Sequence, residues 1–92
     1  MVAIVQTDDV LGGKARLEGR RISVFQIGEM YTEAGESPEY IADQLDLTLT
    51  DVHAALAYYY DHPEEMAEIR RRRADRERDL KEHSHAPKSV EQ

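Results

Sequence analysis

The stretch that decides the fold is residues 37–60, SPEYIADQLDLTLTDVHAALAYYY. Ser37 followed by Pro38 is typical of a helix start, because serine caps the first amides and proline suits the first turn. Thr48 predicts the start of a second helix, with Asp51 three residues later as its capping-box partner. A tight connection then joins a short helix to a longer one, and this spacing is that of a helix-turn-helix.

A third helix is expected ahead of this pair. Val24, Ile27, Gly28 and Tyr31 follow the i, i+3, i+4, i+7 spacing of one apolar helical face. Gly35 fits the position just after the helix, where a left-handed conformation is common. The sequence therefore predicts three helices between residues 24 and 61.

The first 23 residues predict short strands and turns. Residues 2–5 (VAIV) have β-forming side chains, Gly12-Gly13 marks a turn, and residues 15–18 alternate in polarity. Residues 22–24 either extend a strand or open the first helix. Because a two-stranded ribbon is marginal in water, this segment must pack on the helices or on another chain.

A charged helix is predicted to follow Pro63, which breaks the preceding helix and suits the first turn of a new one. Between residues 64 and 82 the only large apolar side chains are Met66, Ile69 and Leu80. Acidic and basic residues at i, i+4 fill most of the remainder, so the helix is either solvated or binds a partner. The polar residues after it predict a tail.

These signals predict a mainly α fold, with a three-helix bundle that contains a helix-turn-helix. A short N-terminal β-strand region precedes the bundle and a charged C-terminal helix follows it. The expected divisions are a helix-turn-helix domain with strands over residues 1–61, the charged helix over residues 62–83 and a flexible tail over residues 84–92.

Composition excludes several classes of protein. The 92 residues include 12 basic and 19 acidic side chains and no cysteine, which removes disulfides, thiolate metal sites and a cysteine nucleophile. No run approaches the roughly 20 apolar residues of a membrane span, and the start lacks a signal-peptide pattern. Histidine and serine show no metal-ligand or catalytic spacing. We expect a cytoplasmic protein that is not an enzyme and has no metal or cofactor.

A net charge of −7 disfavours nucleic acid as a partner. In the first turns of the predicted recognition helix, Thr50 and His53 are polar, but no Arg, Lys, Asn or Gln is present to pair with a base edge. A three-helix core without DNA contacts therefore fits the sequence equally well. For the DNA-binding alternative, the expected phosphate contacts are Lys14, Arg16, Arg20 and Arg21.

Two further features are candidates for partner binding. Arg70–Arg73 form the densest basic run and are spread around the helix; they are a solvated face, phosphate contacts or an insertion into an acidic pocket. Tyr58 and Tyr60 flank the core-facing Tyr59 and mark either an interface or the edge of the core. Gly12-Gly13-Lys14 lacks the spacing of a phosphate-binding loop, so a plain turn is the preferred interpretation.

The chain resembles the family known as domain of unknown function 433, described as VapB-type and antitoxin-like. That family has a Gly-Gly-Lys-Pro turn, then Gly-Thr-Arg-Ile, two helices of set pattern and often His-Pro-Glu-Glu. The resemblance covers about residues 8–66. It rests on Gly12, Gly13, Lys14, Leu17, Gly19, Arg21, Ile22, Val24, Ala34, Gly35, Ser37, Pro38, Ile41, Leu47, Val52, Ala55, Leu56, Tyr58 and Tyr59. Ala15 stands where the family has Pro, and Arg20 stands where it has Thr.

The resemblance implies a homeodomain-like bundle, a homodimer and membership of a toxin–antitoxin module beside a PIN-like ribonuclease. Such nucleases hold a divalent metal in a carboxylate cluster, and a guanidinium can take the place of the metal. The preferred hypothesis is therefore an antitoxin that binds the nuclease through Arg70–Arg73, with Tyr58 and Tyr60 contributing. The alternative is a repressor that binds operator DNA, including that of its own operon, through the helix-turn-helix.

Overall fold

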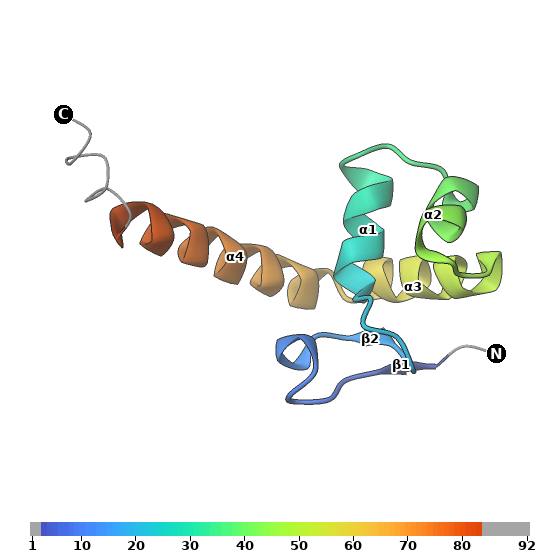
Figure 1. Ribbon diagram of the computed structural model, residues 1–92, viewed down its shortest axis with the longest axis horizontal. Helices are drawn as coiled ribbons and strands as arrows, with labels where there is room; N and C mark the ends of the chain where they lie inside the picture. The colour runs from blue at the N-terminus through green and yellow to red at the C-terminus, as the bar shows by residue number, and fades with distance from the viewer. Residues whose placement is uncertain (1–2, 84–92) are drawn as a thin grey trace.

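The computed structural model describes residues 3–83, and this part is mainly helical with one small sheet (Figure 1). The predicted tail over residues 84–92 lies outside the described residues. In chain order the elements are β1 (Ile4–Val5), a 3-10 turn η1 (Leu11–Gly13), β2 (Arg16–Leu17), α1 (Val24–Thr32), α2 (Pro38–Leu45), α3 (Leu49–Asp61) and α4 (Pro63–His83).

The helix starts follow from local capping. The Ser37 hydroxyl accepts a hydrogen bond from the Tyr40 amide, and Thr48 and Asp51 form the predicted capping box. Ser23 caps α1 by accepting from the amide of the third helical residue, and it also forms an isolated antiparallel bridge with Arg16. Residues 22–24 therefore extend the strand region and lead directly into the helix. α1 ends at Thr32 with Glu33 as its C-cap, slightly earlier than predicted, and Gly35 adopts the expected left-handed conformation with φ +70°.

The sheet is a two-stranded antiparallel ribbon in which Ile4 lies opposite Leu17 and Val5 lies opposite Arg16. The strand predictions are thus confirmed, although each strand has only two residues. Leu17 is almost completely buried, and β2 contacts α3. The ribbon therefore packs against the helices of its own chain, which supplies the apolar contact that an isolated ribbon lacks.

The core is shared by all four helices. Val24, Ile41, Val52 and Met66 come from α1, α2, α3 and α4 in turn, and none exposes more than 1% of its surface. Where α1 crosses α3, Gly28 faces the ring of Tyr59 so closely that a Cβ built on the glycine would lie 2.0 Å from the ring. A glycine is therefore required at this crossing.

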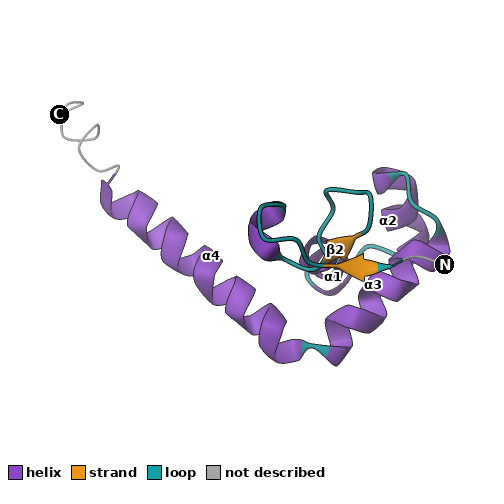
Figure 2. Ribbon diagram, turned by 90° about the horizontal axis from the view of Figure 1, so that it is seen from below, coloured by secondary structure: helices purple, strands orange, loops and turns teal. Residues whose placement is uncertain are grey.

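The last helix gives the molecule its elongated shape. Met66 and Ile69 join the core cluster, but every residue from 70 to 82 is exposed. The radius of gyration is 16.1 Å, whereas a compact chain of this length has about 12 Å. Figures 1 and 2 show α4 leaving the body and projecting away from the other helices. Within the described residues, the side chains of α4 that pack or bond to the body come from its first half.

Candidate functional site

Two of the four predicted arginines fasten α4 to α1 and α3. Arg70 donates a hydrogen bond to the Tyr59 hydroxyl, and its guanidinium lies 5.4 Å from the centre of the Phe25 ring. Arg73 lies 5.2 Å from the centre of the same ring and donates to both carboxylate oxygens of Glu29, at 2.8 and 2.9 Å. The hydrogen bond to Glu29 raises the pKa of Arg73 above its ordinary value. Both arginines therefore fix the base of the projecting helix.

The other two arginines have largely exposed side chains. The side chains of Arg71 and Arg72 are 65% and 66% exposed, and both pair with the single carboxylate of Glu68. The Arg72 Nε lies 3.0 Å from that carboxylate. Exposed ion pairs of this kind contribute at most about 1 kcal/mol to stability. An anion from a ligand or partner can therefore displace the Glu68 carboxylate from these arginines at little cost in free energy.

The two tyrosines beside Tyr59 have different surroundings. Tyr58 stacks on His62 with ring centres 3.8 Å apart and donates a hydrogen bond to Glu65 at 2.9 Å, which ties α3 to α4. Burial, and then the contact with Glu65, raises the pKa of Tyr58 above its ordinary value. Tyr60 is 56% exposed and contacts Tyr59 edge-on, so it presents most of its ring to solvent.

Two N-terminal cations expected at a DNA backbone instead bind backbone carbonyls of their own chain. Arg20 donates from Nη2 to the carbonyls of Leu45 and Asp46, both at 2.8 Å, and so closes the exposed C-terminus of α2. Arg16 donates to the carbonyls of residues 17 and 20, at 3.4 and 3.2 Å, and to the Thr7 hydroxyl at 3.1 Å. These contacts hold the N-terminal segment together.

The remaining DNA candidates are accessible. Arg21 is exposed, and within residues 3–83 no hydrogen bond or ion pair involves its side chain. Lys14 is half-buried and donates to the Leu11 carbonyl at 3.4 Å. Thr50 and His53 are exposed in the first turns of α3. Lys14 and Arg21 therefore have fewer contacts within the described residues than Arg16 and Arg20.

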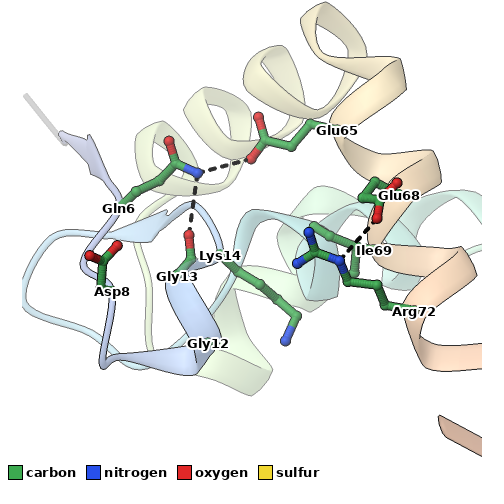
Figure 3. Close-up of a pocket in the computed structure, with 9 residues that line it drawn as sticks. All are labelled: Gln6, Asp8, Gly12, Gly13, Lys14, Glu65, Glu68, Ile69 and Arg72. Atoms are coloured by element: carbon green, nitrogen blue, oxygen red, sulfur yellow. Dashed lines mark hydrogen bonds and ion pairs between the residues drawn. The ribbon is translucent and has the colours of Figure 1, made fainter.

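Lys14 lies beside a groove between the η1 turn and α4, which Figure 3 shows. The groove has a volume of about 350 Å³. Gln6 crosses one end, donating to the Gly13 carbonyl and to the Glu65 carboxylate, both at 3.3 Å. Lys14 and Arg72 project into the space between the turn and the helix.

Several of these residues were not predicted as functional from the sequence. Phe25 and Glu29 lie more than 40 residues from the arginines that they bind, and no local pattern relates them. Arg76 borders the groove beside Arg72. The i, i+4 spacing of these two arginines would have placed them on one face of α4.

The described residues, 3–83, contain neither a candidate metal-binding cluster nor a candidate membrane-spanning helix. Residues 3–83 hold no cluster of three His, Cys, Asp or Glu side chains that is able to bind a metal ion. Over the same residues, no helix combines the length and the apolar surface that a membrane crossing requires.

Comparison with known proteins identifies a family but no relative of known function. A family model described as "Protein of unknown function (DUF433)" matches residues 4–59. No curated protein and no solved structure matches the chain. The matched range contains the sheet, α1, α2 and α3 up to Tyr59, and it ends before α4.

Proposed function

We propose that this chain, which belongs to the DUF433 family of proteins of unknown function, is an antitoxin that neutralises a PIN-like ribonuclease through α4. The observation that carries the proposal is the projection of α4 from the body with Arg71 and Arg72 on its exposed surface. An isolated helix of this polarity gains little by itself and is suited to a partner.

The four arginines divide into two pairs with different tasks. Arg70 and Arg73 hold the base of α4 against Phe25 and Glu29, which sets the direction of the helix. Arg71 and Arg72 supply guanidinium groups that bind a carboxylate with two parallel hydrogen bonds. In the nuclease they would take the place of the divalent metal and thereby stop catalysis.

The part of α4 beyond its anchored base offers further surface to a partner. At about 1.5 Å per residue, the ten residues after Arg73 extend α4 about 15 Å beyond its last contact with Glu29. Leu80 is 67% exposed on this part and offers one apolar contact beside the charges. In this proposal Tyr60, on α3, adds aromatic surface near the base.

The test begins with purification of the tagged chain from its native cytoplasm and identification of bound proteins by mass spectrometry. A bound PIN-like ribonuclease is then purified, and its RNA cleavage is measured against increasing amounts of the chain. We expect inhibition at equimolar concentration. Failure to capture such a nuclease, or undiminished cleavage in the presence of excess chain, would overturn the antitoxin proposal.

A charge-reversal variant tests the role of the arginines. Arg71→Glu with Arg72→Glu should weaken nuclease binding at least 100-fold, because two charge-assisted contacts are lost. Arg21→Glu is the matched control, since it reverses an exposed arginine in the loop before α1, and it should inhibit like the original chain. Circular dichroism verifies that both variants fold. Full inhibition by the double variant would exclude the arginine mechanism.

A DNA-binding autorepressor is the second candidate, with α2 and α3 as a homeodomain-like helix-turn-helix. Exposure of Thr50 and His53 at the start of α3, and of the unpaired Arg21, favours it. The repressor would bind as a homodimer, which places two such helices on one operator. Binding to upstream DNA should weaken steeply with salt and be reduced by Arg21→Glu. Absence of binding at low salt would refute it.

A further inference from the structure

The charged side chains that line one end of the groove beside η1 are all cations. Its lining residues are Gly12, Lys14, Ile69, Arg72 and Arg76, around a volume of about 90 Å³. No carboxylate contributes to this end, although acidic residues outnumber basic ones in the chain. We propose that this cationic pocket binds a phosphate group, a ligand that lies outside the proposed antitoxin function.

Two separate elements bring the three cations together. Gly12 has φ +65°, and the tight η1 turn directs the chain so that the Lys14 ammonium lies over it, 3.9 Å from where a Cβ would be. Arg72 and Arg76 are four residues apart on α4 and so share one face. Ile69 is buried and packs the helix against the core beneath them.

The cations have donors left for a ligand. Within residues 3–83, no hydrogen bond or ion pair involves the Arg76 side chain, and Lys14 has only the long contact with the Leu11 carbonyl. Arg72 pairs with Glu68 through Nε, which leaves the terminal nitrogens of its guanidinium for another acceptor. Three neighbouring positive charges repel one another, and a bound anion relieves that repulsion.

The other end of the groove indicates what the phosphate is attached to. Gln6, Asp8, Glu65 and Glu68 line this wider part, so it is rich in oxygen acceptors. A ligand with a phosphate at one end and hydroxyl or amine donors at the other matches both ends of the groove (Figure 3). The structure thus favours a small phosphomonoester of a hydroxylated compound, such as a sugar phosphate.

The experiment is a titration of the full chain with inorganic phosphate and then with ribose 5-phosphate, followed by amide chemical shifts in NMR spectra. Sodium chloride at matched ionic strength separates binding from screening. We expect saturable shifts at Gly12, Gly13 and the α4 residues that border the pocket. Shifts that merely follow ionic strength would overturn the proposal.

Three variants make the test specific. Lys14→Gln and Arg76→Gln should each weaken phosphate binding about tenfold or more, because each removes a charged donor. Arg78→Gln removes the same charge from α4 at a residue that does not line the pocket, and it should bind phosphate like the original chain. Equal weakening in all three variants would indicate a general charge effect and refute the pocket.

A second titration identifies the source of the phosphate. A short DNA duplex presents backbone phosphates, whereas ribose 5-phosphate presents a free terminal one. Tighter binding of ribose 5-phosphate than of the duplex, lost in Arg76→Gln, supports the small-molecule ligand. If only the duplex bound at these residues, the phosphomonoester assignment would be wrong.

Discussion

Replacing Gly28 with alanine should destabilise the fold, although this change inside a helix normally stabilises by about 1 kcal/mol. A Cβ at this position would lie 2.0, 2.2 and 2.6 Å from three ring atoms of Tyr59. Ordinary contact begins at 3.4 Å, so α1 or the ring would have to move by about 1.4 Å. Overpacking of this severity outweighs the gain in helix propensity.

The Tyr59 ring has little room to move. It is 7% exposed, its hydroxyl accepts a hydrogen bond from Arg70, and Tyr60 contacts its edge. Overpacking costs about 1–3 kcal/mol, and a trapped ring places Gly28→Ala at the upper end of that range. After subtraction of the propensity gain, we expect a net loss of about 2 kcal/mol. For a domain of this size that lowers the melting temperature by about 8–16 °C.

The assay is urea unfolding followed by circular dichroism, together with calorimetry. Ala57→Gly, at an exposed position in α3, calibrates helix propensity in the same protein and should cost about 1 kcal/mol. In a Tyr59→Ala background the three clashing ring atoms are absent, so Gly28→Ala should raise the unfolding midpoint. A single Gly28→Ala variant as stable as the original chain would refute the close crossing of α1 and α3.

Other predictions concern stability and ionisation. Arg20→Thr should cost about 1–2 kcal/mol in urea unfolding, because two carbonyls at the end of α2 lose their donor. Met66→Ala should cost about 2–5 kcal/mol, whereas Leu80→Ala on the projecting part should change stability by less than about 0.5 kcal/mol in the same assay. Phenolate absorbance should show Tyr58 ionising above its ordinary pKa, and Glu65→Gln should lower that pKa. The stabilisation linked to the raised pKa of Tyr58 is complete below pH 10, the pKa of tyrosine in the unfolded chain, and it is lost as the pH rises through the pKa of the folded state. Urea unfolding at a series of pH values across this range measures that loss.

Local chemistry explains what the sequence predicted correctly. Ser37 with Pro38, and Thr48 with Asp51, act within a single helical turn, so the printed residues contain the whole interaction. The boundary between α3 and α4 follows in the same way from Pro63, which begins the new helix. The starts of α2, α3 and α4 were therefore predictable to the residue, whereas the start of α1 was left open between residues 22 and 24.

Contacts between distant segments were not predictable. Arg20 departs from the family pattern, yet in this fold it binds the carbonyls of Leu45 and Asp46, some 25 residues away. The sequence shows that Arg20 is charged, but it does not show that this residue lies beside the C-terminus of α2. From the sequence alone, Arg20 was therefore expected at DNA phosphates.

For Arg70–Arg73, too, the sequence indicated part of the answer and the tertiary contacts the rest. Its density indicated a binding surface, but only the packing of α4 on α1 separates Arg70 and Arg73, bound to Phe25 and Glu29, from the two exposed arginines. Helical periodicity alone spreads all four around the axis. The candidate site was thus predictable as a segment, but the roles of its members depended on tertiary structure.

Arg72 belongs to both proposed sites. It is one of the two exposed arginines that are proposed to bind the nuclease, and it also lines the cationic pocket that is proposed to bind phosphate. A phosphate held there would occupy the guanidinium that a nuclease carboxylate needs, and linkage requires each ligand to weaken the other by the same factor. Saturating inorganic phosphate at matched ionic strength should therefore reduce nuclease affinity for the original chain. Arg76→Gln weakens phosphate binding about tenfold or more without altering Arg71 or Arg72, so the nuclease affinity of this variant should fall less at the same phosphate concentration. Equal sensitivity of both proteins would mean that Arg72 serves only one ligand.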